Sequence, residues 1–410
     1  MQILMVFHAS PCPPELGPSR RNYVMLRELL REHDVTVLSF GTAEQEARFA
    51  REFGSACRAI FLRFPRPRCL AQVRRVWWLL TGRSDFPVAR DRRLQRWLDH
   101  LAATEHFDLI GVSCQMMGSY RFPAGTPLLT DTHNVEFEYL RLGYREATDP
   151  IRKLAYWARW RATRRDELAL LRKFDLVLAV SEADRQVFAR ALPPQRIAVI
   201  PNGIDLAQFK PPPVQPERHT LMFSGLMSYY PNDHGIRWFI ERIFPRVRDE
   251  VPDARLLVVG AHPSRKLRGL AGRGVEVTGY VPRIQPYFAR AQVVVAPLRM
   301  GGGTRVKLLE AMAMRRPVVS TTFGAAGLAA RDGRHLLLAD TPAAFARAVV
   351  NLLRDPRLAA SLVAQAAALV ADEYSWDAIG RRLRDACARL APRLEARSAL
   401  ASRSAASPNG

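Results

Sequence analysis

Cysteine is scarce in this sequence. The five cysteines among its 410 residues are widely spaced and form no CxxC pair. Such spacing argues against a disulfide framework and against a zinc site with cysteine ligands, and it fits a reducing compartment. We therefore expect a cytoplasmic protein.

Long hydrophobic runs are also missing. No run reaches the roughly eighteen apolar residues that a membrane-spanning helix needs. The first residues, MQILMVF, have no basic flank and too short an apolar stretch for a signal peptide, so they predict a first strand. Hydrophobic residues still make up 48% of the chain, which suffices for two cores, and 410 residues favour two domains of similar size.

Acidic residues are outnumbered by basic ones, 39 to 61, which gives a net charge of +22. Residues 58–96 contain eleven arginines and two acidic residues, and residues 152–173 contain eight basic and two acidic residues. Both clusters carry tryptophans, among them Trp77, Trp78 and Trp157. Basic side chains beside tryptophan suit an anionic membrane surface. Nucleic acid would attract the same charge, and a helix with one core-facing and one solvated basic side is a third interpretation.

Short apolar segments recur along both halves of the chain. Thirteen of them predict strands: 3–7, 35–40, 59–64, 109–113, 128–131, 176–180, 197–200, 220–223, 255–259, 275–278, 292–296, 317–320 and 335–338. Helical patterns lie between them, including 22–32, 155–173, 235–247, 342–353 and 357–371. Apolar runs without period-2 alternation indicate parallel sheets covered on both faces. We expect an α/β fold of two Rossmann-like, doubly wound domains that face each other across a cleft, with ligands at the carboxyl ends of the strands.

Composition also suggests where the domains end. A proline-rich segment, residues 211–217, predicts a stiff linker between an N-terminal domain, 1–210, and a C-terminal domain, 218–375. Residues 393–410 are rich in Ser and Ala and predict a disordered tail.

A glycine-rich turn is the most informative segment. Residues 301–310, GGGTRVKLLE, follow the predicted strand 292–296 and open a predicted helix. Glycines let the backbone approach a ligand, helix N–H groups face it, and arginine and lysine add positive charge, so the turn predicts a phosphate site. A carboxylate one turn into the helix could accept hydrogen bonds from sugar hydroxyls. The donor-binding residues predicted here are Gly301, Gly302, Gly303, Thr304, Arg305, Lys307 and Glu310. The alternative is an ordinary strand-to-helix turn with solvated charges.

Several segments resemble one family. Residues 199–205 (VIPNGID) and 174–182 (FDLVLAVSE), together with the glycine turn and residues 309–313 (LEAMA), resemble the glycosyltransferases of family 4, also called glycosyl transferases group 1. The resemblance implies the GT-B fold, and a nucleotide-diphosphate sugar as co-substrate with no other cofactor. Residues 374–376 (YSW) match the point where the last helices of such proteins return, so 376–392 is expected to cross back to the first domain.

The sequence departs from the family pattern at the donor site. The family has two glutamates separated by seven residues; Glu310 is the second and would hold the ribose hydroxyls, whereas Gly302 stands in place of the first. The family also has an arginine and a lysine after the first strand of the second domain, but residues 225–235, with Gly225 and Asn232 of the expected donor site, contain neither. We infer that Arg305 and Lys307 supply this charge as catalytic cations, without a metal ion.

The first domain contributes two further candidates. Residues 131–136, DTHNVE, resemble the family's histidine motif, and His133 is expected to bind a sugar hydroxyl or to stabilise positive charge at the reacting carbon. The alternative is a histidine that caps the next helix. In the loop after the first strand, Gly17 would let the backbone approach donor or acceptor and Arg20 would meet a phosphate, although ordinary turn chemistry would explain both.

The resemblance implies a metal-independent hexosyltransferase that moves a sugar, with retention, onto a hydroxyl of a lipid-linked or saccharide acceptor in the synthesis of cell-surface polysaccharide or glycolipid. One alternative is a nucleotide-sugar epimerase of the same fold. Another is a non-catalytic basic protein that binds membrane or nucleic acid. We expect peripheral contact with the anionic inner face of the plasma membrane and no nucleic-acid partner.

Overall fold

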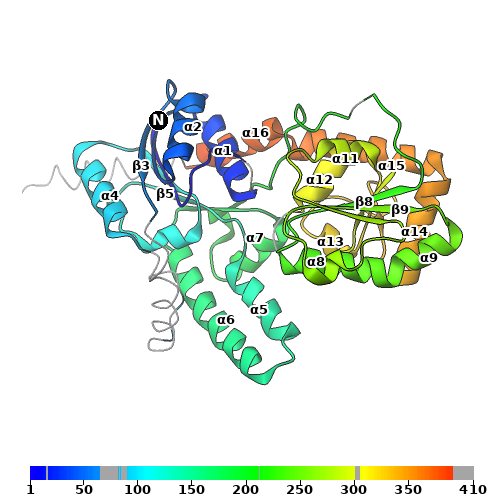
Figure 1. Cartoon of the computed structure of the whole chain (residues 1–410). Coiled ribbons are helices and arrows are strands. Elements are labelled where there is room, and N and C mark those ends of the chain that lie inside the picture. The colour runs from blue at the N-terminus through cyan, green and yellow to red at the C-terminus, as the bar shows by residue number, and fades with distance from the viewer. Residues whose placement is uncertain are drawn as a thin grey trace, which may run out of the picture. The chain divides into compact units, whose positions relative to one another are not determined.

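The computed structural model describes residues 1–14, 17–64, 82, 84, 90–211, 213–300 and 305–390 (Figure 1). The chain forms two compact units: unit 1 is Met1–Pro201 with the chain from Gly380 onward, and unit 2 is Asn202–Ile379. The first boundary therefore lies before the proline-rich segment. Residues after Pro201 join unit 2 because the Ile204 N–H donates to the Tyr374 carbonyl at 2.8 Å and the Trp376 N–H donates back to Ile204 at 3.1 Å. The predicted tail lies outside the described residues.

Unit 1 is built on a seven-stranded sheet in the order β3-β2-β1-β4-β5-β6-β7, and every pairing is parallel. The strands are β1 (Gln2–Phe7), β2 (Asp34–Phe40), β3 (Arg58–Leu62), β4 (Leu109–Val112), β5 (Leu128–Asp131), β6 (Leu176–Ala179) and β7 (Ile197–Val199). The order reverses between β1 and β4, as expected of a doubly wound sheet.

The helices of unit 1 include the last helix of the chain. They are α1 (Gly17–Leu29), α2 (Ala43–Phe53), α4 (Arg92–Thr104), α5 (Glu136–Glu146), α6 (Pro150–Leu171), α7 (Glu182–Ala189) and α16 (Trp376–Ala388), which enters unit 1 at Gly380. Arg384 of α16 pairs with the buried Glu28 of α1 at 2.9 Å, and a Cβ at Gly380 would lie 2.3 Å from the Glu28 carboxylate. This close contact fixes α16 against α1. No helix in the described ranges is both long and apolar enough to cross a membrane.

Unit 2 is built on a six-stranded parallel sheet in the order β10-β9-β8-β11-β12-β13. Its strands are β8 (Thr220–Ser224), β9 (Arg255–Val259), β10 (Val275–Gly279), β11 (Val293–Ala296), β12 (Val318–Ser320) and β13 (Leu337–Leu338). All thirteen predicted strands are thus present in the two sheets, with ends that differ by at most two residues. The parallel sheets confirm the predicted α/β class.

The helices of unit 2 are α8 (Tyr230–Trp238), α9 (Phe244–Glu250), α10 (Arg265–Arg268), α11 (Gln285–Arg290), α12 (Val306–Ala313), α13 (Thr322–Ala325), α14 (Pro342–Arg354) and α15 (Pro356–Leu369). The sequence predicted one helix over 235–247. A π-helical turn, Phe239–Ile243, instead separates α8 from α9. Pro245 has no N–H to donate to the preceding turn, so the regular helix cannot run through it.

Both faces of the unit 2 sheet are buried. Along β8, Leu221 and Phe223 belong to one apolar cluster, whereas Met222 between them belongs to another. Successive strand side chains point to opposite faces, and both faces here need cover. This explains why the strand sequences are apolar throughout and lack alternation.

Candidate functional site

The strand order of unit 2 reverses between β8 and β11, and in open parallel sheets this is where ligands bind. Gly225 directly follows β8, and the glycine turn follows β11. Gly301, Gly302, Gly303 and Thr304 lie outside the described residues, so the site is described from the residues around them.

Lys307 is the centre of this site. It is the second residue of α12, and its Nζ donates to Asn232 Oδ1, in the first turn of α8, at 2.7 Å. The ammonium also lies 4.3 Å from the centre of the Phe223 ring, within the range of a cation–π contact. The amino ends of two helices therefore meet at one lysine.

Gly225 is required by this close packing. Its φ is +154°, and a Cβ there would lie 2.7 Å from Asn232 Nδ2 and 2.9 Å from Lys307 Nζ. Any side chain would displace the amide or the ammonium, and L-residues rarely adopt this backbone conformation. The structure thus brings together Gly225, Asn232 and Lys307, three of the residues predicted to bind the donor.

The electrostatics of the site favour an anion. The pKa of Lys307 is lowered to about 7, chiefly because its ammonium is buried and secondly because of the charge of Arg305, while Glu310 acts in the opposite direction. Arg305 is itself only 7% exposed and its guanidinium carbon lies 5.2 Å above the Phe323 ring. An incoming diphosphate would offset the repulsion between these two cations.

Glu310 lies on the same side of α12 as Lys307, three residues further along. It is partly buried, and its charge acts on Lys307. The structure therefore places a carboxylate beside the cationic site, and its role in binding ribose stays a prediction.

In unit 1 the strand order reverses between β1 and β4, and histidines collect at this edge. His8 follows β1. Its backbone N–H donates to Oγ of Ser113, which lies just after β4, at 2.9 Å. His133 follows β5. Desolvation lowers the pKa of both imidazoles, although His8 is exposed and His133 only partly buried; for His133, the charge of Asp131 acts upward and those of Arg21 and His8 act downward. Both rings are therefore favoured in the neutral form near pH 7, in which each can accept and donate one hydrogen bond.

The sequence pattern did not single out His8, although its place as the first residue after the first strand was a usable signal. The sequence also predicted a role for Arg20, whereas its neighbour Arg21 makes the buried contact. Arg21 of α1 donates to both carboxylate oxygens of Asp131, at 2.6 and 2.5 Å, and both residues are buried. Arg20 Nε points to the Pro14 carbonyl at 3.5 Å, and Gly17 is the first residue of α1.

The loop that carries His133 is held by a buried carboxylate. Glu167 of α6 accepts hydrogen bonds from the N–H groups of Glu136 and Phe137, at 3.2 and 3.0 Å, and from Gln115 Nε2 at 3.0 Å. Burial raises the pKa of Glu167 to about 8, against the effect of these donors. Glu167 therefore caps the amino end of α5, where the N-cap residue Val135 makes no side-chain bond. The alternative in which His133 caps this helix is not what the structure has.

Two family models match the chain over most of its length. The model described as "Glycosyltransferase Family 4" matches residues 17–208, and that described as "Glycosyl transferases group 1" matches residues 218–355. In described residues, no group of three His, Cys, Asp or Glu side chains could hold a metal ion.

Similar proteins include a phosphatidyl-myo-inositol mannosyltransferase of Mycobacterium leprae, 30% identical over 50% of this chain and 57% of that protein. A GDP-mannose-dependent alpha-(1-6)-phosphatidylinositol monomannoside mannosyltransferase of Mycolicibacterium smegmatis is 27% identical over 96% of this chain and 100% of that protein. The chain spans little more than half the length of the first curated relatives it matches, 58%, 57% and 53%.

Among solved structures, Anabaena HepE in complex with UDP superposes with a TM-score of 0.67 and 15% identity, over 95% of this chain and 100% of that one. At this identity the likeness shows the fold alone. The fold, the two family models and their order along the sequence agree, and the chain belongs to the family 4 (group 1) glycosyltransferases of the GT-B fold.

Proposed function

We propose that the protein transfers a sugar from a nucleotide-diphosphate donor to a hydroxyl acceptor, with retention at the anomeric carbon and without a metal ion. The observation that carries the proposal is the position of Lys307, whose ammonium lies between Gly225 and Asn232 at the carboxyl edge of the unit 2 sheet. A buried cation at this edge suits the diphosphate of a nucleotide sugar.

The site replaces charge that the family usually carries elsewhere. Asn232 lies in the stretch after β8 where related enzymes have a lysine, and it is the residue that Lys307 contacts. In our proposal the ammonium therefore reaches the usual place from α12 instead of from α8. Arg305, buried at the start of α12, adds the second positive charge.

These two cations would act on the leaving group. Negative charge on the diphosphate grows as the bond to the sugar breaks, so Arg305 and Lys307 stabilise the transition state more than the bound substrate. In a front-face reaction the departing phosphate takes the proton of the acceptor hydroxyl, so no protein base is needed. His133, neutral at pH 7, would bind a hydroxyl of the transferring sugar or stabilise positive charge at its reacting carbon.

The names of two relatives support a proposal for the class of acceptor. Two of them are named as mannosyltransferases of phosphatidylinositol lipids. We propose a lipid-linked or saccharide acceptor and a role in making cell-surface polysaccharide or glycolipid.

A panel of nucleotide sugars tests the proposal by thermal shift. A true donor at about one hundred times its Kd should stabilise the protein by about 2.7 kcal/mol, whereas other nucleotides should not. Incubation with that donor, without acceptor, separates the enzyme classes. An epimerised nucleotide sugar as sole product would favour the epimerase. Failure of every nucleotide to bind would favour a non-catalytic protein.

The ribose assignment is tested with Glu310→Ala. Losing hydrogen bonds to a charged acceptor should weaken binding of free nucleoside diphosphate by about 1.5–3 kcal/mol. Glu241→Ala, an exposed glutamate of unit 2, is the matched control and should bind normally. Equal affinities of Glu310→Ala and wild type would remove Glu310 from the donor site.

A further inference from the structure

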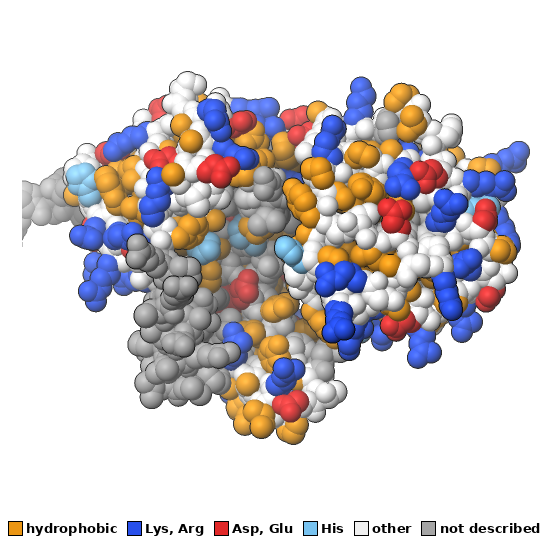
Figure 2. Space-filling model, viewed as in Figure 1, with side chains coloured by type: hydrophobic (Ala, Val, Ile, Leu, Met, Phe, Trp, Pro, Cys, Tyr) orange, Lys and Arg blue, Asp and Glu red, His pale blue; other side chains and the backbone are white. Residues whose placement is uncertain are grey.

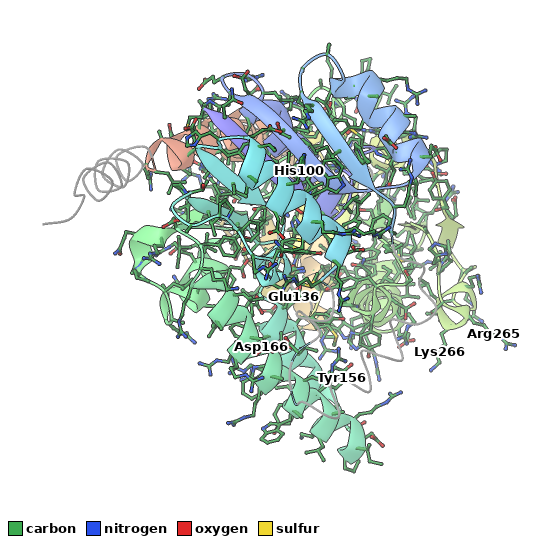
Figure 3. The ribbon with its side chains drawn as sticks, turned by 90° about the vertical axis from the view of Figure 1, so that its left-hand side faces the viewer. His100, Glu136, Tyr156, Asp166, Arg265 and Lys266 are labelled. Atoms are coloured by element: carbon green, nitrogen blue, oxygen red, sulfur yellow. The ribbon has the colours of Figure 1, made fainter. Side chains whose placement is uncertain are left out.

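Helices α5 and α6 form a hairpin that extends away from the sheet of unit 1 (Figure 1). The two helices touch closely: a Cβ at Gly143 of α5 would lie 2.6 Å from the ring of Tyr156 of α6. Tyr144 and Trp160 stack across the pair with centroids 6.3 Å apart. Figure 3 shows Glu136 where α5 leaves the body of unit 1, and Asp166 and Tyr156 further out along the hairpin. The hairpin is thus held firmly at its base and along its length.

Its outer part exposes large apolar side chains. Ile151 is 79% exposed, Leu154 64% and Trp157 39%; Tyr139, near the base of the hairpin at the start of α5, is 47% exposed. These are four of the eleven exposed large hydrophobic residues in the described chain, gathered on one hairpin. Ile151, Leu154 and Trp157 follow one another at intervals of three, so they lie along one side of α6. Scattered exposed hydrophobics need no explanation, but a cluster on a projecting element marks an interaction surface.

A basic side chain lies on the same side of α6 as these apolar residues. Arg161 follows Trp157 by four residues, and its guanidinium lies 5.3 Å from the centre of that ring. Helix α6 carries six basic residues and two acidic ones in its sequence PIRKLAYWARWRATRRDELALL. Glu167 is buried, whereas Asp166 pairs with the exposed Arg165 and bonds to Ser84, so one of the six basic charges is offset. On the face in Figure 2, the hairpin shows hydrophobic side chains together with Lys and Arg, and an acidic side chain near its end.

We propose that the outer face of the α5–α6 hairpin docks on an anionic lipid membrane. Ile151 and Leu154, at the start of α6, would enter the boundary between headgroups and acyl chains. Trp157 would lie at the headgroup level, where an amphipathic ring is favoured. Arg152, Lys153 and Arg161 would contact lipid phosphates, with their stems along the apolar surface. The inference goes beyond the catalytic proposal and does not depend on it, because it concerns lipid binding by the folded protein alone.

The charge of the hairpin is tested with two adjacent basic residues. Arg152→Gln/Lys153→Gln removes an exposed Arg-Lys pair from the first turn of α6. Arg265→Gln/Lys266→Gln removes the same exposed pair from α10 of unit 2, labelled in Figure 3, and is the matched control. The probe is cosedimentation of the full chain with vesicles of phosphatidylglycerol and phosphatidylcholine, and with phosphatidylcholine alone.

Wild type should bind the anionic vesicles at low salt, and binding should weaken in high salt and on neutral vesicles. Each basic residue near an anionic surface contributes about fivefold in affinity, so the α6 variant, which loses two, should bind about twenty-five-fold more weakly. The α10 variant should bind like wild type. Equal losses in both variants would mean that only net charge matters, which would overturn the assignment to the hairpin.

The apolar residues are tested with Ile151→Ser/Leu154→Ser, which should lower vesicle binding by at least about tenfold, because each side chain loses apolar burial. Leu206→Ser/Val214→Ser, exposed apolar residues of unit 2, are the control. Normal vesicle binding by the α6 variant would overturn the proposal. So would light scattering that shows a wild-type dimer dissociated by this variant, since the occupant would then be a second copy. Tighter binding to duplex DNA than to anionic vesicles, weakened by Arg152→Gln/Lys153→Gln, would identify nucleic acid instead.

Discussion

The carboxyl edges of the two sheets have the same topology and different electrostatics. In unit 1 the buried carboxylate of Asp131 is matched by Arg21, and partial desolvation favours the neutral forms of His8 and His133. In unit 2, Arg305 and Lys307 are brought together with the neutral Asn232, and Glu310 is the carboxylate that acts on Lys307. At the unit 1 edge the buried positive and negative charges pair with each other. At the unit 2 edge the positive charge is in excess, and a bound anion would neutralise it.

This difference indicates how one fold can divide the work of a transfer reaction. A balanced edge with neutral imidazoles suits hydroxyl groups, which need hydrogen bonds and not charge. A cationic edge suits a diphosphate. The parallel sheet supplies the position of both edges, and the residues one or two places beyond each strand decide their chemistry.

Breaking the buried Arg21–Asp131 ion pair of unit 1 should have the largest effect, on the free energy of unfolding. Asp131→Asn leaves Arg21 buried without its partner, which should lower the free energy of unfolding by about 3–5 kcal/mol in urea denaturation. Glu44→Gln breaks the exposed Arg48–Glu44 pair of α2 and should cost only about 0.3–0.5 kcal/mol. Similar losses in the two variants would show that the buried pair stabilises unit 1 no more than an exposed pair does.

Neutralising the cationic edge should act on turnover. Arg305→Gln/Lys307→Gln should lower kcat by about a hundredfold or more, and saturating donor should not restore it, because the lost stabilisation belongs to the transition state. Arg265→Gln/Lys266→Gln carries the same change of charge on exposed side chains of α10 and serves as the control. A fall of less than threefold would mean that Arg305 and Lys307 are ordinary charges of a strand-to-helix turn.

The variant His133→Ala tests whether the unit 1 edge acts on the sugar. We expect kcat to fall by at least tenfold, which is about 1.4 kcal/mol in the barrier, while affinity for free nucleoside diphosphate changes little. The reason is that His133 should act on the sugar and not on the nucleotide. Initial rates and titration of the diphosphate measure the two effects separately. A variant with normal turnover and lowered stability would make His133 a structural residue.

The sequence predicted the strands well because apolar runs in buried parallel sheets are distinctive, and it placed Gly225, Lys307 and His133 at strand ends through their local context. It could not choose between Arg20 and Arg21, since adjacent arginines on one helix differ only in the direction they face. Glu167 was missed for another reason. Its partners, the N–H groups at the start of α5, lie about thirty residues earlier, and a glutamate in an arginine-rich helix looks solvated until the fold is known.

The smallest and most specific effect is a proton taken up on donor binding. With its pKa lowered to about 7, Lys307 is mostly neutral at pH 8 in the free protein. A bound diphosphate favours the charged form and raises this pKa, so binding at pH 8 should take up close to one proton. Affinity should be level below pH 7 and should fall by up to about tenfold per pH unit above it, until the pKa of the bound state is reached. Calorimetry in two buffers of different ionisation enthalpy measures the uptake. Lys307→Met should bind more weakly and take up no proton, whereas a wild-type affinity that is the same at pH 7 and pH 9 would place the ammonium away from the diphosphate.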